Sequence, residues 1–206
     1  MERLSACLTL RKVLQGTTIF AKGDAGTELI AVLSGRIKIS VPSQDGREAV
    51  LNVVHEGEVF GEIALLDGRV RTADAVAITD CELMLIERRR FLPVLYEQPE
   101  VAIKLIEVLC ARLRQTSEQV EDVMFLNLRI RMAKLVLRLA DEAEGPLPRT
   151  ILVTQQEMSR MIGVSRESIN KQLRSRARAK WVRLERGGIV VLKPDSLTDI
   201  VVKPNF

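Results

Sequence analysis

The spacing of apolar residues changes near residue 99, and this change divides the chain into two kinds of structure. Between residues 17 and 86, short runs of β-branched and aliphatic residues alternate with turns that contain glycine or aspartate. From Pro99 to about Val123, apolar residues recur at every third or fourth position instead. A period of two is typical of strands, and a period of 3.6 is typical of helices. The sequence therefore predicts an α+β chain in which a small β domain leads into a helix of roughly 25 residues.

The first part of the chain contains several runs of strand-like sequence. They cover residues 19–20, 29–33, 37–41, 49–54 and 83–86. In one run, Ile37, Ile39 and Val41 alternate with polar residues, as expected of a strand with one buried face. Asp45 and Gly46 lie between two runs and are typical of a tight hairpin turn. Strands at this spacing predict a small barrel or jelly roll.

The long helix carries a line of residues at helical spacing. The line consists of Leu105, Leu109, Arg112, Thr116, Val120 and Val123. A helix that extends beyond a small β domain is expected to bury such a line against a second copy of itself. The alternative is a helix that packs only against its own β domain.

The last third of the chain starts with a second amphipathic helix. Residues 125–127 predict a hinge, and residues 128–143 predict the helix, which the sequence GPLP at 145–148 should end. Residues 151–153 predict one short strand.

Two capped helices are expected next. Thr154 and Glu157 match a capping box, so a helix of about two turns should begin after Thr154. Gly163 suits a left-handed turn, and Ser165 is a favourable N-cap for a helix of residues 166–177. The residues expected to face inward are Met158, Met161, Ile162, Ile169 and Leu173. This order of helix, glycine turn and capped helix predicts a helix-turn-helix.

Positive charge is concentrated in the same region. Residues 1–125 carry a net charge of −4 and residues 126–206 carry +8, which together give the chain its +4. Between Ser165 and Arg186 there are eight basic residues and two acidic ones. Such a segment attracts phosphate backbones. The alternative is a solvated basic face without a partner.

The second helix of the pair has the side chains needed to read bases. Its outer face carries Arg166, Glu167, Asn170, Lys171 and Arg174. Arginine donates two hydrogen bonds to guanine, and glutamate accepts one from cytosine. The alternative is that Arg166 and Glu167 are surface residues of a first turn, where the helix dipole favours glutamate.

A wing is expected after this helix. Residues 182–184 and 189–192 predict two strands joined through Gly187 and Gly188, with Arg183 and Arg186 placed to contact phosphate.

The β domain contains a candidate anion site. The sequence GEVFGEIALL at 57–66 is followed by RTA at 71–73. Glycine lets a backbone approach a phosphate closely, successive amides form an anion nest, and Arg71 offers bidentate pairing. Glu62 would repel a phosphate, but it suits a ribose hydroxyl. The alternative is an ion pair between arginine and glutamate in a β loop.

The few cysteines and the single histidine argue against most classes of enzyme and of metal-binding protein. Cys7, Cys81 and Cys110 lie far apart, and His55 is the only histidine, so neither a disulfide framework, a metal site nor a histidine-dependent triad is expected. No apolar run approaches the ~20 residues that cross a bilayer, and the start does not match a secretory signal. We therefore expect a cytoplasmic protein that is not an enzyme, without a metal or a membrane partner.

These motifs resemble those of a known family. The sequence FGEIAL at 60–65 with RTA at 71–73, followed by a long helix and then GVSRE at 163–167, resembles the Crp–Fnr family of bacterial transcription regulators, in its catabolite activator branch. The resemblance runs from about Gly16 to Leu192. It implies a cyclic-nucleotide-binding β jelly roll at residues 1–97, a dimerisation helix and hinge at 98–126, and a winged helix-turn-helix at 127–206.

The resemblance also assigns roles in a cyclic-nucleotide pocket. It implies that Glu62 takes the ribose 2′-hydroxyl, Arg71 pairs with the cyclic phosphate and Thr72 hydrogen-bonds to it. Thr116 would contact the base in its own subunit, and Ser117 would reach the pocket of the other subunit. The implied ligand-binding residues are Gly61, Glu62, Ile63, Ala64, Arg71, Thr72, Arg112, Thr116 and Ser117. The implied ligand is cAMP; cGMP is the alternative, because Thr72 stands where cAMP-activated members usually have serine.

The implied function is that of a cyclic-nucleotide-responsive transcription regulator. It would bind near-palindromic duplex DNA as a homodimer and contact RNA polymerase. The implied DNA-binding residues are Thr154, Gln156, Ser165, Arg166, Glu167, Ser168, Asn170, Lys171 and Arg183. One alternative is a family member that binds DNA without cyclic nucleotide or answers another signal. Two others are an enzyme acting on nucleotides and a dimerisation module whose basic tail binds nucleic acid without sequence preference.

Overall fold

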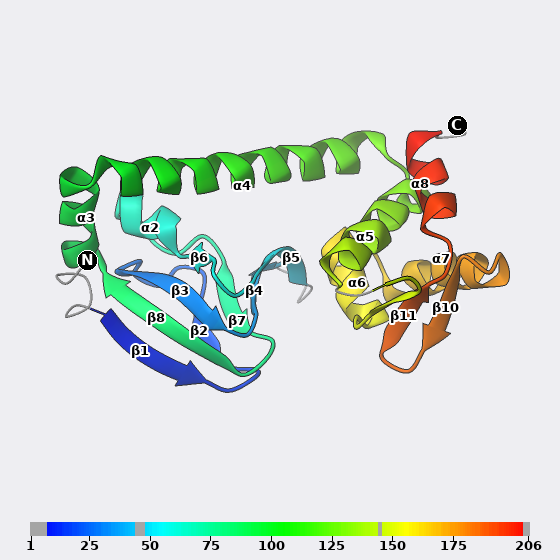
Figure 1. Cartoon of the computed structure of the whole chain (residues 1–206), viewed down its shortest axis with the longest axis horizontal. Helices are drawn as coiled ribbons and strands as arrows, with labels where there is room; N and C mark the ends of the chain where they lie inside the picture. The colour runs from blue at the N-terminus through cyan, green and yellow to red at the C-terminus, as the bar shows by residue number, and fades with distance from the viewer. Residues whose placement is uncertain (1–7, 44–47, 144–145, 204–206) are drawn as a thin grey trace. The chain divides into compact units, whose positions relative to one another are not determined.

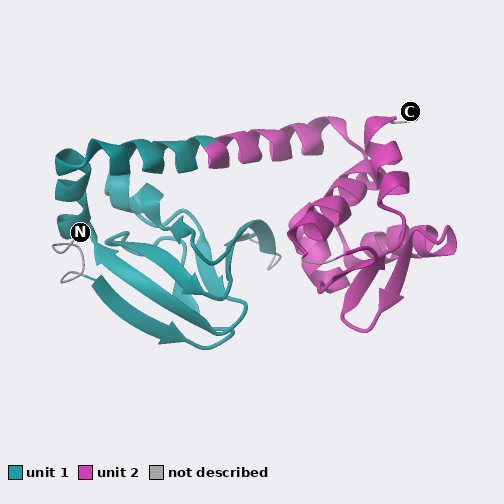
Figure 2. Ribbon diagram, viewed as in Figure 1, with its two compact units in different colours: residues 1–110 teal, residues 111–206 magenta. Residues whose placement is uncertain are grey.

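The computed structural model describes residues 8–43, 48–143 and 146–203. The chain forms two compact units, residues 1–110 and 111–206 (Figure 2). The boundary falls inside the long helix α4 (Pro99–Phe125). The three-part division at 97/98 and 126/127 remains a prediction, and the expected turn at Asp45 and Gly46 lies outside the described residues.

The first unit is built on two antiparallel sheets (Figure 1). One sheet has the order β1 (Leu8–Val13), β8 (Cys81–Glu87), β3 (Glu28–Ser34) and β6 (Val59–Phe60). The other has the order β2 (Thr18–Phe20), β7 (Asp74–Ala77), β4 (Ile37–Pro42) and β5 (Glu48–Val54). Buried residues of both sheets, among them Ile30, Leu83 and Ile37, form one core cluster. The predicted jelly roll is confirmed.

Helices cover part of this unit. They are α2 (Glu62–Asp67), α3 (Arg88–Glu97) and the first turns of α4. Leu105 of α4 is buried with Phe91 of α3 and Leu65 of α2. The predicted outward line through Leu105 is therefore wrong at its start, because the β unit covers this residue. The residues of α4 that are exposed along one line are Ile103, Ile106, Cys110, Leu113, Ser117, Val120 and Met124.

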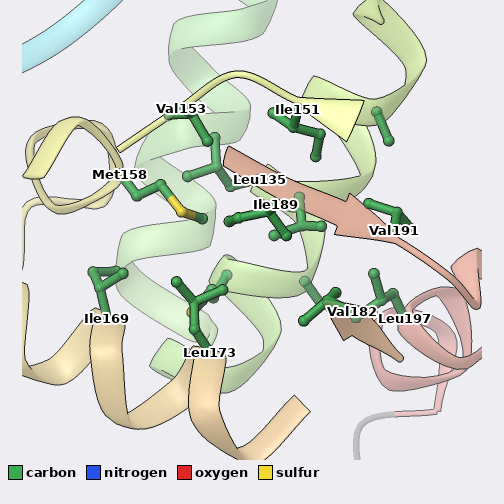
Figure 3. Packing of buried hydrophobic residues seen from close by; sticks show 14 of the residues in the cluster. Leu135, Ile151, Val153, Met158, Ile169, Leu173, Val182, Ile189, Val191 and Leu197 are labelled. Carbon is green, nitrogen blue, oxygen red and sulfur yellow. The ribbon is translucent and has the colours of Figure 1, made fainter. Parts of the chain in front are cut away.

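The second unit contains the predicted winged helix-turn-helix. Its helices are α5 (Leu128–Glu142), α6 (Gln155–Ile162), α7 (Arg166–Arg178) and α8 (Pro194–Val202). Its sheet has the order β10 (Val182–Glu185), β11 (Gly188–Val191) and β9 (Arg149–Ile151). Side chains from these helices and strands meet in one core, where Met158, Ile169 and Leu173 are buried as predicted (Figure 3). Met161 is only partly buried.

The boundaries of these helices follow from side-chain caps. Asn127 accepts a hydrogen bond from the amide of Ile130 and starts α5. Thr154 and Glu157 form the predicted capping box at α6, and Ser165 accepts from the amide of Ser168 at α7. Between α6 and α7, Gly163 has a φ of 76°. Among the described residues, no helix has both the length and the apolar character needed to span a membrane.

Replacing Gly163 with alanine tests the turn between the two helices. A Cβ at this position would meet no atom within 4 Å, so the cost comes only from the left-handed backbone. We expect a loss of about 1–2 kcal/mol in the free energy of unfolding of this unit. Denaturant titration followed by the fluorescence of Trp181, the single tryptophan, measures it. Gly163→Asn should lose less, because asparagine tolerates this conformation; equal losses would contradict the explanation.

Candidate functional site

The head of α2 is shaped by a left-handed glycine. Gly61 has a φ of 81° and precedes Glu62, the first residue of α2. The amides of a first helical turn have no partners inside the helix, and they carry partial positive charge. Glu62 and Ala64 are buried, whereas Ile63 is exposed. The anion nest predicted from glycine and successive amides is thus the start of a short helix.

Arg71 lies against this helix start and is almost completely buried, with 4% of its surface exposed. Its Nη1 donates to the carbonyl of Gly61 at 2.7 Å, and its Nη2 donates to the carbonyl of Glu28 at 2.8 Å. The guanidinium carbon lies 4.2 Å from the centre of the Phe20 ring, which attracts the cation. Nε is buried and has no hydrogen-bond partner within the described part of the chain.

Burial governs the electrostatics of Arg71. Desolvation lowers the pKa of the guanidinium, while the carboxylates of Glu28, Glu62 and Asp24 act in the opposite direction. A buried cation with an unpaired N–H is expected to gain from an anionic ligand. The site therefore fits a phosphate group. The carboxylate of Glu62 also acts on Arg71 through its charge, and this attraction is equally expected from the alternative of an ion pair between the two residues.

Two glycines make this packing possible. A Cβ on Gly61 would lie 2.5 Å from Nη1 of Arg71, and a Cβ on Gly26 would lie 2.1 Å from the Cβ of Ala64. Sequence reasoning identified Gly61 but missed Gly26, Phe20 and Glu28. Their contacts with the site join residues far apart in the chain, and no local motif marks them.

The opposite end of α2 is held by another arginine. Nε of Arg88 donates to the carbonyl of Leu65 at 2.6 Å. Arg71 and Arg88 thus fix the two ends of the short helix. Thr72, the predicted phosphate ligand beside Arg71, is exposed.

The predicted ligand residues of the long helix lie in the other unit. Thr116 donates its hydroxyl hydrogen to the carbonyl of Arg112 at 2.9 Å, and Ser117 donates to the carbonyl of Leu113 at 2.9 Å. Both residues are exposed on α4. The assignment of Arg112, Thr116 and Ser117 to the pocket remains a prediction.

The first turns of α7 present the expected polar face. Arg166, Glu167, Lys171 and Arg174 are exposed, and Asn170 is half-buried. These side chains are available to a partner on one side of the helix, while Ile169 and Leu173 anchor the other side.

The two serines at this helix start serve the cap. The amide of Ser168 donates to Oγ of Ser165 at 3.2 Å, and the two hydroxyl oxygens are 2.9 Å apart. Their contact with DNA remains a prediction beside this structural role.

A cavity of about 380 Å³ lies beside this face. It brings together Thr154, Gln156 and Arg166, three of the predicted DNA-binding residues, with Glu185 and Gly187 of the wing. Thr154 also serves the capping box, in which its hydroxyl accepts from the amide of Glu157 at 3.2 Å. The same hydroxyl donates to the Glu157 carboxylate at 2.8 Å.

Two arginines differ from their expected surroundings. Arg183 of the wing donates from Nε and Nη2 to the same oxygen of Glu185, at 3.0 and 2.8 Å, so its charge is partly neutralised. Arg176 is buried, whereas the other basic residues between Ser165 and Arg186 are exposed. The predicted basic surface therefore has one cation fewer than the sequence indicates.

Comparison with known proteins assigns each of the two units to a known domain family. Residues 10–98 match the cyclic nucleotide-binding domain family, and residues 130–200 match the Crp-like helix-turn-helix domain family. A CRP-like cAMP-activated global transcriptional regulator of Mycobacterium tuberculosis is 34% identical over 203 residues, which cover 94% of this chain and 91% of that protein. The cyclic AMP receptor protein of Thermus thermophilus is 34% identical over 186 residues, which cover 90% of this chain and 85% of that protein.

A solved structure extends the likeness to the fold. The c-di-GMP responsive global regulator CLP of Xanthomonas campestris aligns with a TM-score of 0.84 and 25% identity, over 93% of this chain and 97% of that chain. The chain thus belongs to the Crp–Fnr family of DNA-binding transcription regulators with a cyclic nucleotide-binding domain, a family of regulators and not of enzymes.

Proposed function

We propose that this chain is a cAMP-responsive transcription regulator that binds near-palindromic duplex DNA as a homodimer in the cytoplasm. The observation that carries the proposal is Arg71, a buried cation with an unpaired Nε beside the left-handed Gly61 at the head of α2. The cAMP-activated relatives support the choice of ligand.

In this proposal, different residues of the pocket bind different parts of the nucleotide. Arg71 and the first-turn amides of Ile63 and Ala64 hold the cyclic phosphate, with Thr72 as an additional donor. Glu62 accepts a hydrogen bond from the ribose 2′-hydroxyl. Arg112, Thr116 and Ser117 meet the base and link the ligand to the paired long helices.

The exposed line on α4 supports the homodimer. Its residues are spaced alternately by three and four positions, from Ile103 through Leu113 to Met124. That spacing is a heptad pattern, and apolar heptads bury themselves against another helix. Two copies would carry two α7 helices, which suits a site with two half-sites.

Calorimetric titration of the whole protein with cAMP, cGMP and c-di-GMP tests the ligand. We expect cAMP to bind most tightly and to raise affinity for a palindromic duplex, selected from a random pool, over a scrambled duplex of the same composition. A nucleotide that binds without changing DNA affinity would contradict the regulatory part. Absence of any binding would contradict the pocket.

A second candidate is a regulator of this family that responds to a different signal. It is favoured by the c-di-GMP responsive relative, and by the two carbonyl groups that already hold Arg71 in place. In that case c-di-GMP would exceed cAMP in the titration, or DNA binding would be independent of all three nucleotides.

Glu167→Gln and Arg183→Gln should have different effects on DNA binding. Glu167 is expected to read a base, so its replacement should reduce discrimination at one base pair by an amount near 1–3 kcal/mol. Arg183 is expected to contact phosphate, so its loss should weaken binding to all duplexes and reduce the salt slope by about 1. Fluorescence anisotropy with single-base variants at several salt concentrations measures both. Loss of discrimination in the Arg183 variant alone would reverse the assignment.

A further inference from the structure

Arg176 is a buried cation in the helix that carries the DNA-reading face. Only 3% of its surface is exposed, although it lies in α7 among exposed polar residues. The charge that acts on it is that of Arg129, a second cation. Desolvation, assisted by Arg129, lowers the pKa of Arg176 to about 10, so the side chain stays charged at neutral pH.

The hydrogen bonds of Arg176 join two helices. Nη1 donates to the main-chain carbonyl and to Oε1 of Gln172, at 3.0 and 2.9 Å, inside α7. Nη2 donates to the carbonyl of Arg129 at 2.6 Å, across to α5. Nε is buried and unpaired among the described residues. All three acceptors are neutral, so none supplies the countercharge that usually accompanies a buried arginine.

The place where Arg176 meets α5 is next to the hinge. Arg129 is the second residue of α5, and only Leu126 and Asn127, the cap of α5, separate that helix from α4. The Arg176 contact therefore links α7 directly to the first turn of α5. A leucine would fill a buried site at lower cost than an unpaired cation, so packing alone does not account for arginine here.

We propose that Arg176 is a positioning residue for DNA recognition, which fixes the orientation of α7 against the first turn of α5. The inference rests on the proposed DNA-binding function and concerns how the base-contacting residues of α7 are oriented. Arg166 and Glu167 lie at the other end of the same rigid helix, so a small rotation at Arg176 displaces them relative to base edges.

Arg176→Leu and Arg176→Lys separate positioning from packing and from charge. The control is Arg178→Leu, which removes a cation from an exposed position of the same helix. Unfolding is followed through Trp181, and affinity is measured for the selected palindromic duplex and for its scrambled counterpart. We expect Arg176→Leu to unfold at the same or a higher denaturant concentration than the wild type. Its preference for the palindrome should fall about tenfold or more, because misaimed side chains lose at least one base contact.

The other variants should behave differently. Arg176→Lys should keep the charge without restoring the preference, because one ammonium group does not reproduce the planar fork. Arg178→Leu should weaken both duplexes alike. Gln172→Ala removes one acceptor and should lower the preference by a smaller factor, which keeps the test available if Arg176→Leu fails to fold.

Three outcomes would overturn the inference. They are an unchanged preference in Arg176→Leu, full rescue by lysine, and equal losses on both duplexes. A wild-type protein that does not distinguish the duplexes would instead refute the proposed function.

Discussion

Arg71→Ala is expected to weaken cyclic-nucleotide binding by at least about 100-fold and to remove the effect of nucleotide on DNA binding. A phosphate paired with a buried guanidinium has lost its water, so deletion of the cation leaves an uncompensated charge that costs about 3–5 kcal/mol. Arg69, two residues away in the same loop, is exposed, whereas Arg71 is buried. Calorimetry with the nucleotide that the wild-type protein binds most tightly measures the loss.

The structural role of Arg71 must be separated from its role in binding. The side chain also holds the carbonyls of Gly61 and Glu28 and contacts Phe20, so its removal loosens the start of α2. Arg71→Lys keeps the charge but not the two-carbonyl bridge, and should recover part of the affinity. Arg69→Ala removes an exposed cation two residues away and should have little effect. Wild-type affinity in Arg71→Ala would refute the pocket.

Local signals predicted the second unit well. The capping box of Thr154 and Glu157, the turn at Gly163 and the cap at Ser165 each act within a few residues, and each was confirmed at the predicted position. The helix α8 was missed, although Pro194 occupies a favourable first position. The strand-like run that ends at Leu192 was the last element predicted from the sequence.

In the first unit, several elements and contacts could not be predicted from the sequence pattern. Runs of β-branched and aliphatic residues predicted β2, β3, β4, β5 and β8, but β1, β6 and β7 were missed. Most residues of β1 are exposed, so it lacks the apolar run that marks a buried strand. In α3, Pro93 within the helix concealed the helical pattern. The pocket depends on Glu28 and Phe20, whose distance in sequence from Arg71 hides their role.

In the long helix, the spacing of the apolar residues and the direction in which they face are set by different things. The spacing of three and four residues predicted the helix correctly, but its outward face depends on what the β unit covers. Leu105 is buried there, so the exposed line passes through Ile106 and Leu113 instead. Arg176 is a similar case. A charged residue is expected on the surface, but in the folded chain Arg176 is buried.

Leu113→Lys is expected to raise the dissociation constant of the homodimer by more than about 1,000-fold. Leu113 is 68% exposed within one chain, so lysine there should leave the fold of the single chain unchanged. In a paired helix the same position lies in the apolar seam, and each dimer would bury two unpaired charges at a cost of several kcal/mol. Sedimentation velocity over a range of concentrations measures the shift from dimer to monomer.

Glu118→Lys is the matched control, because Glu118 is exposed on α4 but lies off the heptad line. It should remain dimeric. Cys110 gives an independent measurement, since it lies one turn before Leu113 on the same exposed line. In a parallel pair the two Cys110 thiols face each other, and the oxidant diamide should join them into a covalent dimer.

The cross-link should be absent from Cys110→Ser and strongly reduced in Leu113→Lys. Two half-sites bound by separate chains lose the advantage of linkage, so the affinity of Leu113→Lys for the palindromic duplex should fall by 100-fold or more. A single half-site should be bound as well as by the wild-type protein, because the face of α7 is intact. A monomeric wild-type protein, or a Leu113→Lys variant that stays dimeric, would show that the exposed line of α4 is not the surface that brings two reading helices onto one site.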